Sequence, residues 1–398
     1  MPTFAAKFEV MKKILIGLLA LTAWTFVSCD KDDPEEDPIA ERTVLVYMAA
    51  QNNLNSFAHY DLLEIEEGMK NIGNNHLVVY HDRAMQDPVL LHYRNGELRD
   101  SIPMDPAAVV CDPATLKAVA KKAFTDYPAN DYGLVLWGHA SGWLFRNDTL
   151  ASANARKRAY GGTNKNGSNY GAGDTWMNIH MMAKALATLP HMKFIFADCC
   201  NMMCAEVAYE LKDVCDYFIG SAAEIPGNGA PYGQVVPAMM EKETFYQSIC
   251  DKYAVSYNDH VPLAVVKSSE MVSLAEATKT VLQSMKAADN LPQYPNLSDL
   301  IYYLDKNLYD INHFIKTYAS DAEYNSWKKA FDKAIVYKKF AKQWDTMNHV
   351  SFLDFDMTEE NFGGMSMFVP QWKLQSTDNQ YIQKFKWYYA AGYDTIGW

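Results

Sequence analysis

A histidine and a cysteine stand at the ends of two apolar runs that are predicted to be buried strands. His139 closes the run YGLVLWGH, and Cys200 closes the run KFIFADCC one loop, one helix and one strand later. Adjacent strands of a sheet are about 4.8 Å apart, so side chains at neighbouring carboxyl ends come within reach of each other. A thiol beside an imidazole is the arrangement of a nucleophile and its base. The pair therefore predicts cysteine-dependent catalysis at the edge of a sheet.

Only one of the two adjacent cysteines at this strand end is expected to reach the site. Side chains alternate between the faces of a strand, so Cys199 is expected in the core if Cys200 faces the site. The residues after Cys200 are predicted to be helical, and a helix N-terminus favours the thiolate. The alternative is a packed, inert thiol, which is the commoner fate of a buried strand cysteine. Cys204, Cys215 and Cys250 are expected to be buried as well.

The remaining reactive groups give weaker signals. The turn GHASG, Gly138–Gly142, offers backbone N–H groups that could hold an oxyanion. The spacing of the cysteines around position 200 does not match a structural zinc site, and no stretch has the pattern of an EF-hand loop. The sequence requires no cofactor and predicts no metal site, with a calcium site built from scattered carboxylates left as an open alternative.

The elements that must position the histidine and the cysteine alternate regularly along the chain. Nearly continuous apolar runs predict strands covered on both faces of a parallel sheet, at Thr43–Ala50, His76–Arg83, Tyr132–His139, Lys193–Cys200 and Asp216–Ala223. Helical patterns lie between them, at Phe57–Lys70, Ala114–Phe124, Met177–Leu189 and Met202–Lys212. This alternation predicts an α/β fold, a three-layer α/β/α sandwich with a mostly parallel central sheet.

The chain is predicted to divide into a catalytic domain over residues 42–260 and a largely helical C-terminal extension over residues 261–398. The extension contains a late strand, Gly363–Pro370, and is expected to pack on the same sheet, the alternative being a separate helical lobe. Hydrophobic residues make up 49% of the chain and charged residues 21%, which excludes a disordered or fibrous protein. The net charge of −12 argues against nucleic acid as a partner.

The N-terminus is predicted to be a lipoprotein signal peptide, residues 1–28. A basic start at Met11–Lys13 precedes the apolar run Ile14–Val27, which is shorter than the roughly 20 residues of a spanning helix. The run ends in FVSC, which resembles a lipobox, so Cys29 is the expected site of lipid attachment. Residues 29–41 form an acidic linker similar to the tethers of surface lipoproteins in some Gram-negative bacteria. We therefore expect an outer-membrane lipoprotein at the cell surface, with an ordinary secretory peptide or a membrane anchor as alternatives.

Several motifs along the chain resemble those of the clostripain family of cysteine peptidases, relatives of caspases and gingipains. They cover the chain from about Arg42 to its end and read RTVLVYMAAQNNL, GLVLWGHASGW, FADCCNMMCAEVAYEL, FIGSAAEIPGNGAPY, FGGMSMFVP and the closing GW. The resemblance implies a caspase-like fold and a cysteine endopeptidase. Counted back from Glu206 in EVAYEL, the family's nucleophile falls on Cys200. His139 is then the implied general base and acid.

The resemblance also implies a substrate and a mode of activation. Asp198 matches the family's S1 aspartate, so peptides or proteins with Arg or Lys at P1 are the implied substrates, through a charge-assisted hydrogen bond. A solvated strand-end carboxylate is the alternative for this residue. Family members are often matured by self-cleavage in the loop that here spans residues 140–175. The candidate cleavage positions in it are Arg156, Lys157, Arg158 and Lys165, with an ordinary basic loop as the alternative.

The sequence departs from the family pattern at the pocket rather than at the dyad. Gly138 and Ala140 flank the histidine where the family has Asn or Asp and Gly, and Ala222–Ala223 replace two acids, with Glu224 following. Asn201 stands where the family has Leu. A second hypothesis is a catalytically silent surface lipoprotein that binds glycan or protein on a peptidase-like scaffold. A thiol redox role ranks third, because the adjacent cysteines are not a C-x-x-C pair.

Overall fold

The structure is a computed structural model. It describes residues 39–144, 159–163, 175–292, 300–304, 308–341, 344, 358–370 and 381–398. The chain divides into two units, Met1–Ile39 and Ala40–Trp398, and all elements below belong to the second. The predicted lipidation site and cleavage positions lie outside the described residues, namely Cys29, Arg156, Lys157, Arg158 and Lys165. What was expected of these positions therefore remains a prediction.

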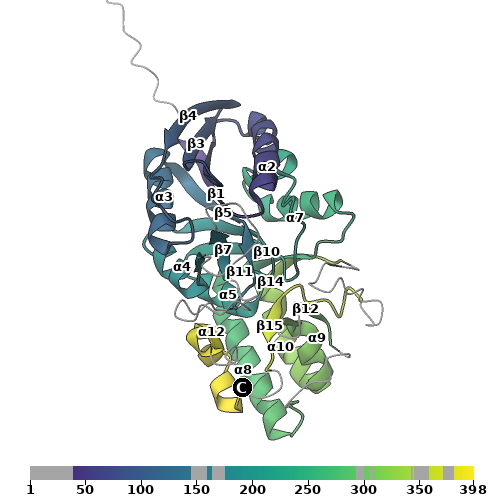
Figure 1. Cartoon of the computed structure of the whole chain (residues 1–398). Helices are drawn as coiled ribbons and strands as arrows, with labels where there is room; N and C mark the ends of the chain where they lie inside the picture. Colours follow the sequence, from purple (N-terminus) through teal and green to yellow (C-terminus); the bar gives the residue numbers. More distant parts are fainter. Residues whose placement is uncertain are drawn as a thin grey trace, which may run out of the picture. The chain divides into compact units, whose positions relative to one another are not determined.

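The five predicted strands form the parallel centre of a nine-stranded sheet (Figure 1). They are β1 (Ala40–Ala50), β2 (His76–Arg83), β5 (Ala129–Trp137), β9 (Met192–Asp198) and β10 (Cys215–Gly220). The order across the sheet is β14-β11-β10-β9-β5-β1-β2-β3-β4, and the pairs from β2 to β10 are all parallel. The predicted α/β class and mostly parallel sheet are thus confirmed, because these runs are buried on both faces.

Antiparallel strands that the sequence analysis did not predict complete both edges of the sheet. They are β3 (Val89–Arg94) and β4 (Glu97–Pro103) on one side, and β11 (Leu263–Lys267) and β14 (Ile335–Lys339) on the other. Asn95 and Gly96 join β3 to β4 with φ values of 53° and 78°. This Asn-Gly pair is a strong hairpin signal in any sequence, but β4 is almost wholly exposed and has no apolar pattern of its own.

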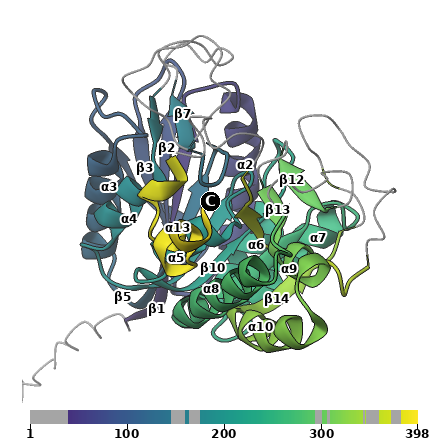
Figure 2. The same ribbon diagram turned by 90° about the horizontal axis from the view of Figure 1, so that it is seen from below.

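Helices cover both faces of the sheet, which makes the three layers (Figure 2). One face packs against α2 (Asn55–Gly68), α6 (Tyr232–Met239) and α7 (Phe245–Ser256). The other packs against α3 (Pro113–Asp126), α4 (Ile179–Leu186), α5 (Ala205–Leu211) and α8 (Met271–Ala287). Alternate residues of β1 serve the two cores, with Val46 and Met48 on the first face and Leu45 and Tyr47 on the second.

The C-terminal region contributes both to the main sheet and to a small sheet of its own. Its strand β14 pairs with β11, whereas the predicted late strand is β15 (Ser366–Phe368), in a three-stranded sheet with β12 (Tyr302–Leu304) and β13 (Leu308–Asp310). Its helices are α9 (Ile311–Tyr318), α10 (Asp321–Ala334), α12 (Lys386–Ala390) and α13 (Tyr393–Ile396). Short 3-10 helices lie at Met69–Asn71, Ser268–Glu270 and Ile382–Lys384. Over the described ranges, no helix has both the length and the apolar character to cross a bilayer.

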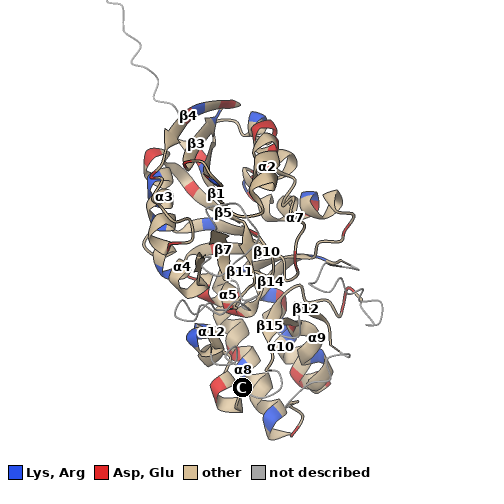
Figure 3. Cartoon of the chain, viewed as in Figure 1, with Lys and Arg blue, Asp and Glu red and all other residues tan. Residues whose placement is uncertain are grey.

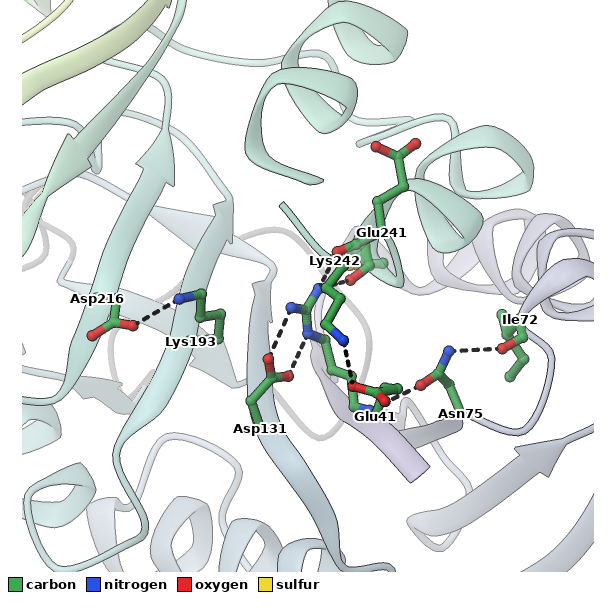
Figure 4. A network of polar contacts seen from close by, with 10 residues as sticks. Glu41, Ile72, Asn75, Asp131, Lys193, Asp216, Glu241 and Lys242 are labelled. Carbon is green, nitrogen blue, oxygen red and sulfur yellow. Dashed lines mark hydrogen bonds and ion pairs between the residues drawn. The ribbon is translucent and has the colours of Figure 1, made fainter. Parts of the chain in front are cut away.

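The buried Arg42 joins the amino ends of β1 and β5, and its partners Asp131 and Glu241 are labelled in Figure 4. Arg42, at the start of β1, makes a bidentate ion pair with Asp131 of β5, at 2.5 Å and 3.0 Å. The same guanidinium donates to the carbonyl oxygens of Met239 and Glu241 at the end of α6. In the view of Figure 3, acidic and basic residues are interspersed over the outer helices, and the central strands are mostly uncharged.

Candidate active site

The carboxyl ends of β5 and β9 lie side by side, and one of the two predicted catalytic residues follows each. Trp137 pairs with Asp198 in the parallel register, so His139 and Cys200 leave the sheet at the same level. The backbone N–H of Gly138 donates to the carbonyl oxygen of Asp198 at 3.4 Å, which joins the two strand ends. His139 then starts the short strand β6 (His139–Ala140). This strand pairs with β7 (Tyr160–Thr163), which in turn pairs with β8 (Thr175–Met177).

One cavity brings the three predicted site residues together. It has a volume of about 240 Å³, and His139, Cys200 and Asp198 all contribute to its lining. Trp137 and Glu224 line it as well. A base, a thiol and a carboxylate therefore share one open space of side-chain size, which is the set of groups that the sequence placed at these strand ends.

Cys200 is the only half-buried thiol among the described cysteines. The other five, including Cys199, are buried free thiols, as the sequence analysis expected of Cys199 and Cys204. Burial raises the pKa of the Cys199 thiol well above its ordinary value, which keeps it in the unreactive protonated form. The backbone N–H of Ile225 donates to Cys200 Sγ at 3.4 Å. Of the two adjacent thiols, Cys200 is thus the one that can meet a substrate.

The helix after Cys200 starts later than predicted. The expected helix began at Met202, but α5 begins at Ala205, because Asn201 has a left-handed φ of 60° and turns the chain. The backbone N–H of Asn201 donates to Ala223 O, and Cys204 forms an isolated parallel bridge with Ser366. The helix thus begins five residues after Cys200 rather than two, and one backbone N–H donor to the sulfur belongs to Ile225.

The imidazole of His139 has a partner that the sequence analysis missed. Its Nε2 lies 3.0 Å from Oδ1 of Asn53, an exposed residue in the loop between β1 and α2. An amide oxygen can only accept a hydrogen bond, so this contact favours a proton on Nε2. Nδ1 is then the basic nitrogen. Asn53 lies in the motif RTVLVYMAAQNNL, but nothing in its spacing relates it to a histidine so far along the chain.

Asp198 is buried, with 3% of its surface exposed, and its carboxylate is held by three donors. Oδ2 accepts from the N–H of Ala230 at 2.9 Å and from the hydroxyl of Tyr232 at 2.8 Å, and Oδ1 accepts from the hydroxyl of Tyr253 at 3.2 Å. Burial raises the pKa of Asp198 to about 6, while these hydrogen bonds oppose the rise. This environment differs from the solvated strand-end acid that was the alternative.

The turn after the histidine is more fully bonded than the sequence suggested. The N–H groups of Gly138 and Ser141 already donate, to Asp198 O and Ala159 O respectively. These two N–H groups are therefore unavailable to an oxyanion, which would have to be held by other N–H groups of the turn. Ala140, which replaces the family's glycine, does not have a positive φ, so the side chain brings no backbone strain. In the described part of the chain, no group of three or more Cys, His, Asp or Glu residues could hold a metal ion.

The comparisons with known proteins agree with the motifs. The sequence model of the clostripain family matches residues 46–396. The chain belongs to the clostripain family. A secreted C11 cysteine protease from Bacteroides thetaiotaomicron, solved with an irreversible peptide inhibitor, is similar to it at 30% identity and a TM-score of 0.74. That match covers 89% of this chain and 100% of the other. No curated protein matched the chain.

Two further solved structures are similar to this clostripain-family chain. An inactive zymogen C11 protease from Parabacteroides distasonis shares 28% identity at a TM-score of 0.74, with 89% of this chain and 99% of that one covered. A B. fragilis cysteine protease shares 33% identity at a TM-score of 0.51, with 57% and 97% covered. The family and these structures make the chain a cysteine-type peptidase with a caspase-like fold.

Proposed function

We propose that this peptidase cleaves polypeptides after Arg or Lys through a dyad of Cys200 and His139. The observation that carries the proposal is the cavity that both residues share with the buried carboxylate of Asp198. A carboxylate that is largely removed from water binds a cationic P1 side chain by a charge-assisted hydrogen bond. Such a bond is about twice as strong as a neutral one. Glu224 adds a second carboxylate to the cavity wall.

The proposed reaction is acyl transfer through a thioester. His139 takes the proton of Cys200, and the thiolate attacks the carbonyl carbon that follows the P1 residue. The imidazolium gives that proton to the leaving nitrogen as the C–N bond breaks, which leaves an acyl-enzyme. His139 then takes a proton from water, the hydroxide attacks the thioester, and the returned proton restores the thiol. In this reaction Asn53 orients the imidazole by accepting a hydrogen bond from Nε2.

We also propose how the peptidase is activated and where it is located. A peptidase with a basic P1 preference would accept its own loop, since Arg156, Lys157, Arg158 and Lys165 lie between the histidine and the cysteine in sequence. The similarity to an inactive zymogen C11 protease supports activation by cleavage. We further propose that Cys29 carries a lipid that anchors the chain in the outer membrane, because the FVSC run and the acidic linker resemble those of surface lipoproteins.

The test is hydrolysis of fluorogenic peptides with Arg, Lys or Asp at P1 by protein that lacks residues 1–29, before and after nicking with trypsin. Cys200→Ala and Cys199→Ala are assayed in parallel, because they remove adjacent thiols of which only one lines the cavity. We expect cleavage after Arg or Lys that is lost in Cys200→Ala and retained in Cys199→Ala. Turnover by neither the wild type nor the nicked protein would contradict the proposal and favour a catalytically silent binding protein.

A further inference from the structure

A second buried carboxyl lies next to Asp198, behind the wall of the cavity. Asp61, on α2, is 2% exposed, and its Oδ2 accepts a hydrogen bond from Trp137 Nε1 at 2.6 Å. Trp137 lines the cavity together with Asp198. Burying an ionisable side chain such as Asp61 costs free energy unless a partner compensates its charge, so its position behind the cavity calls for an explanation.

Gly229 shows how close the two carboxyls are. A methyl group at this position would lie 2.8 Å from Oδ2 of Asp198 and 3.2 Å from Oδ2 of Asp61. It would also lie 3.2 Å from Trp137 Nε1. Both carboxyl oxygens therefore face one glycine, and that residue has no side chain to separate them. The pair is built by three distant parts of the sequence, α2, the end of β9 and the loop before α6.

Two carboxylates this close in a buried site repel each other, so one of them tends to keep a proton. Burial, with the negative charge of Asp198 as the next cause, raises the pKa of Asp61 to about 8. The pKa of Asp198 is raised to about 6 by burial. Around neutral pH the pair therefore holds about one proton.

The other ionisable groups that face the pair do not neutralise it. Glu64, on α2, adds a negative charge near Asp61. The phenols of Tyr232, Tyr253 and Tyr257 face the pair from α6, from α7 and from the residue after α7, and burial raises the pKa of each. The charges that act on Asp61 come from Asp198 and Glu64, and no lysine or arginine of the described ranges lines the cavity, which Asp198 shares with His139 and Glu224. A cation that enters the cavity would thus be the missing counter-charge.

We propose that Asp61 and Asp198 form a carboxyl pair that holds a proton while the cavity is empty and releases it when a cationic P1 side chain binds. This inference rests on the proposed preference for Arg or Lys. The guanidinium or ammonium replaces the proton as the partner of the negative charge, so cation and proton compete for the same pair. Asp61 is a positioning residue in this scheme, since it acts through Asp198 and Trp137.

The competition has a defined sign. At pH 6 the pair still holds at least one proton, which the P1 cation must displace, whereas at pH 8.5 the pair is largely ionised. The KM for an Arg-P1 peptide therefore falls as the pH rises, by up to about tenfold for each pH unit over which one proton is released. In Asp61→Asn the amide oxygen still accepts from Trp137, but the variant lacks the proton that Asp61 carries, which is the one with the higher pKa in the pair. The KM of that variant should stop falling above about pH 7.

The measurement is the ratio of KM in Asp61→Asn to KM in the wild type from pH 6 to pH 9, with an Arg-P1 peptide. We expect a ratio near one at pH 6 that rises to about tenfold at pH 8.5, with kcat similar in both proteins. A peptide with citrulline at P1, the uncharged isostere of Arg, should give no such rise. Glu67→Gln, at an exposed acid on the same helix that is not among the charges acting on Asp61, is the matched control and should behave as the wild type.

A measurement on the Cys200→Ala protein makes the test independent of the Asp61 variant. Calorimetric binding of a peptide that ends in Arg amide, in two buffers of different ionisation enthalpy at pH 7, should show release of up to one proton. A flat KM ratio, or binding without proton release, would overturn the inference while leaving the peptidase proposal intact. Failure of the wild type to cleave Arg or Lys peptides at all would overturn the proposed function itself.

Discussion

The amide oxygen of Asn53 lies 3.0 Å from Nε2 of His139, and this contact joins the loop after β1 to the end of β5. It favours a proton on Nε2 and helps to orient the imidazole, because the oxygen can only accept. Asn53, the side chain that orients the predicted base, thus belongs to a motif that lies much earlier in the sequence than His139. The contact is exposed, so its contribution to stability is small.

We expect Asn53→Ala to lower kcat by about 10- to 100-fold on a basic-P1 peptide, since the ring then loses its preferred tautomer and orientation. KM should change little, because Asn53 does not belong to the carboxylate part of the site. Asn53→Asp should shift the pH profile, since an adjacent carboxylate stabilises the imidazolium and raises the pH at which His139 titrates. Ser56→Ala, an exposed change in the first turn of α2, is the control. An unchanged kcat in Asn53→Ala would rule out the orienting role.

The sequence could predict the centre of the fold and the pair His139 and Cys200 from local patterns, whereas Asp198 was implied by the resemblance to the clostripain family. Continuous apolar runs mark strands that are buried on both faces, and His139, Asp198 and Cys200 stand where those runs end. The antiparallel edges were missed because strands such as β4 are exposed and have no apolar pattern. Their place depends on pairing with neighbours that only the folded chain provides.

The supporting residues of the site could not be predicted for a related reason. Asn53 and Asp61, before and within α2, and Tyr253 of α7 each contact a residue of the cavity that lies far from them in sequence. No spacing rule connects such positions, since their proximity results from the packing of helices on the sheet. The start of α5 was misplaced because a helical pattern does not reveal that Asn201 takes a left-handed φ.

Replacing Asp198 by Asn should remove most of the preference for basic P1 residues. The variant keeps an oxygen for Tyr232 or Tyr253, but it loses the negative charge that would bind the P1 cation. We expect kcat/KM for an Arg-P1 peptide to fall by about 100-fold, equivalent to the roughly 3 kcal/mol of a charge-assisted hydrogen bond. Kinetics with paired Arg and citrulline peptides measure the change.

The matched control for this change is Tyr253→Phe, which removes one donor to Asp198 and keeps the charge. Because its hydroxyl lowers the pKa of Asp198, its loss should raise that pKa further above its ordinary value. The KM for basic substrates should then rise on the acid side of the profile and recover at higher pH. Equal selectivity for Arg and citrulline in the wild type would contradict the role of Asp198.

Gly229→Ala should disturb the carboxyl pair through a single methyl group. The residue has a φ of +63°, and the new Cβ would lie 2.8 Å from Asp198 Oδ2. We expect a loss of about 1–2 kcal/mol in the free energy of unfolding from the left-handed backbone, together with a clear rise in KM for Arg-P1 peptides. Gly73→Ala separates the two effects, because Gly73 has a φ of +59° with no atom within 4 Å. It should lose stability similarly but keep its KM.

Glu206 should make the stability of the fold depend on pH near neutrality. It is fully buried at the start of α5, and its Oε1 accepts from the N–H of Phe368 in β15 at 2.9 Å. Burial raises the pKa of Glu206 to about 7, so the folded chain keeps a proton that the unfolded chain releases above about pH 4.5. The stabilising contribution of this proton is complete below pH 4.5 and is lost as the pH rises through 7.

We expect Glu206→Gln to remove this dependence, since the amide oxygen can still accept from Phe368 and nothing at this position ionises. Urea unfolding at several pH values measures it. Relative to the wild type, the variant should gain about 3 kcal/mol between pH 4.5 and pH 7.5, the equivalent of the shift from 4.5 to about 7. Glu276→Gln, an exposed change on α8, should track the wild type at each pH. A constant difference between Glu206→Gln and the wild type would mean that Glu206 is ionised in the folded chain, and that β15 is held to α5 by a buried charge.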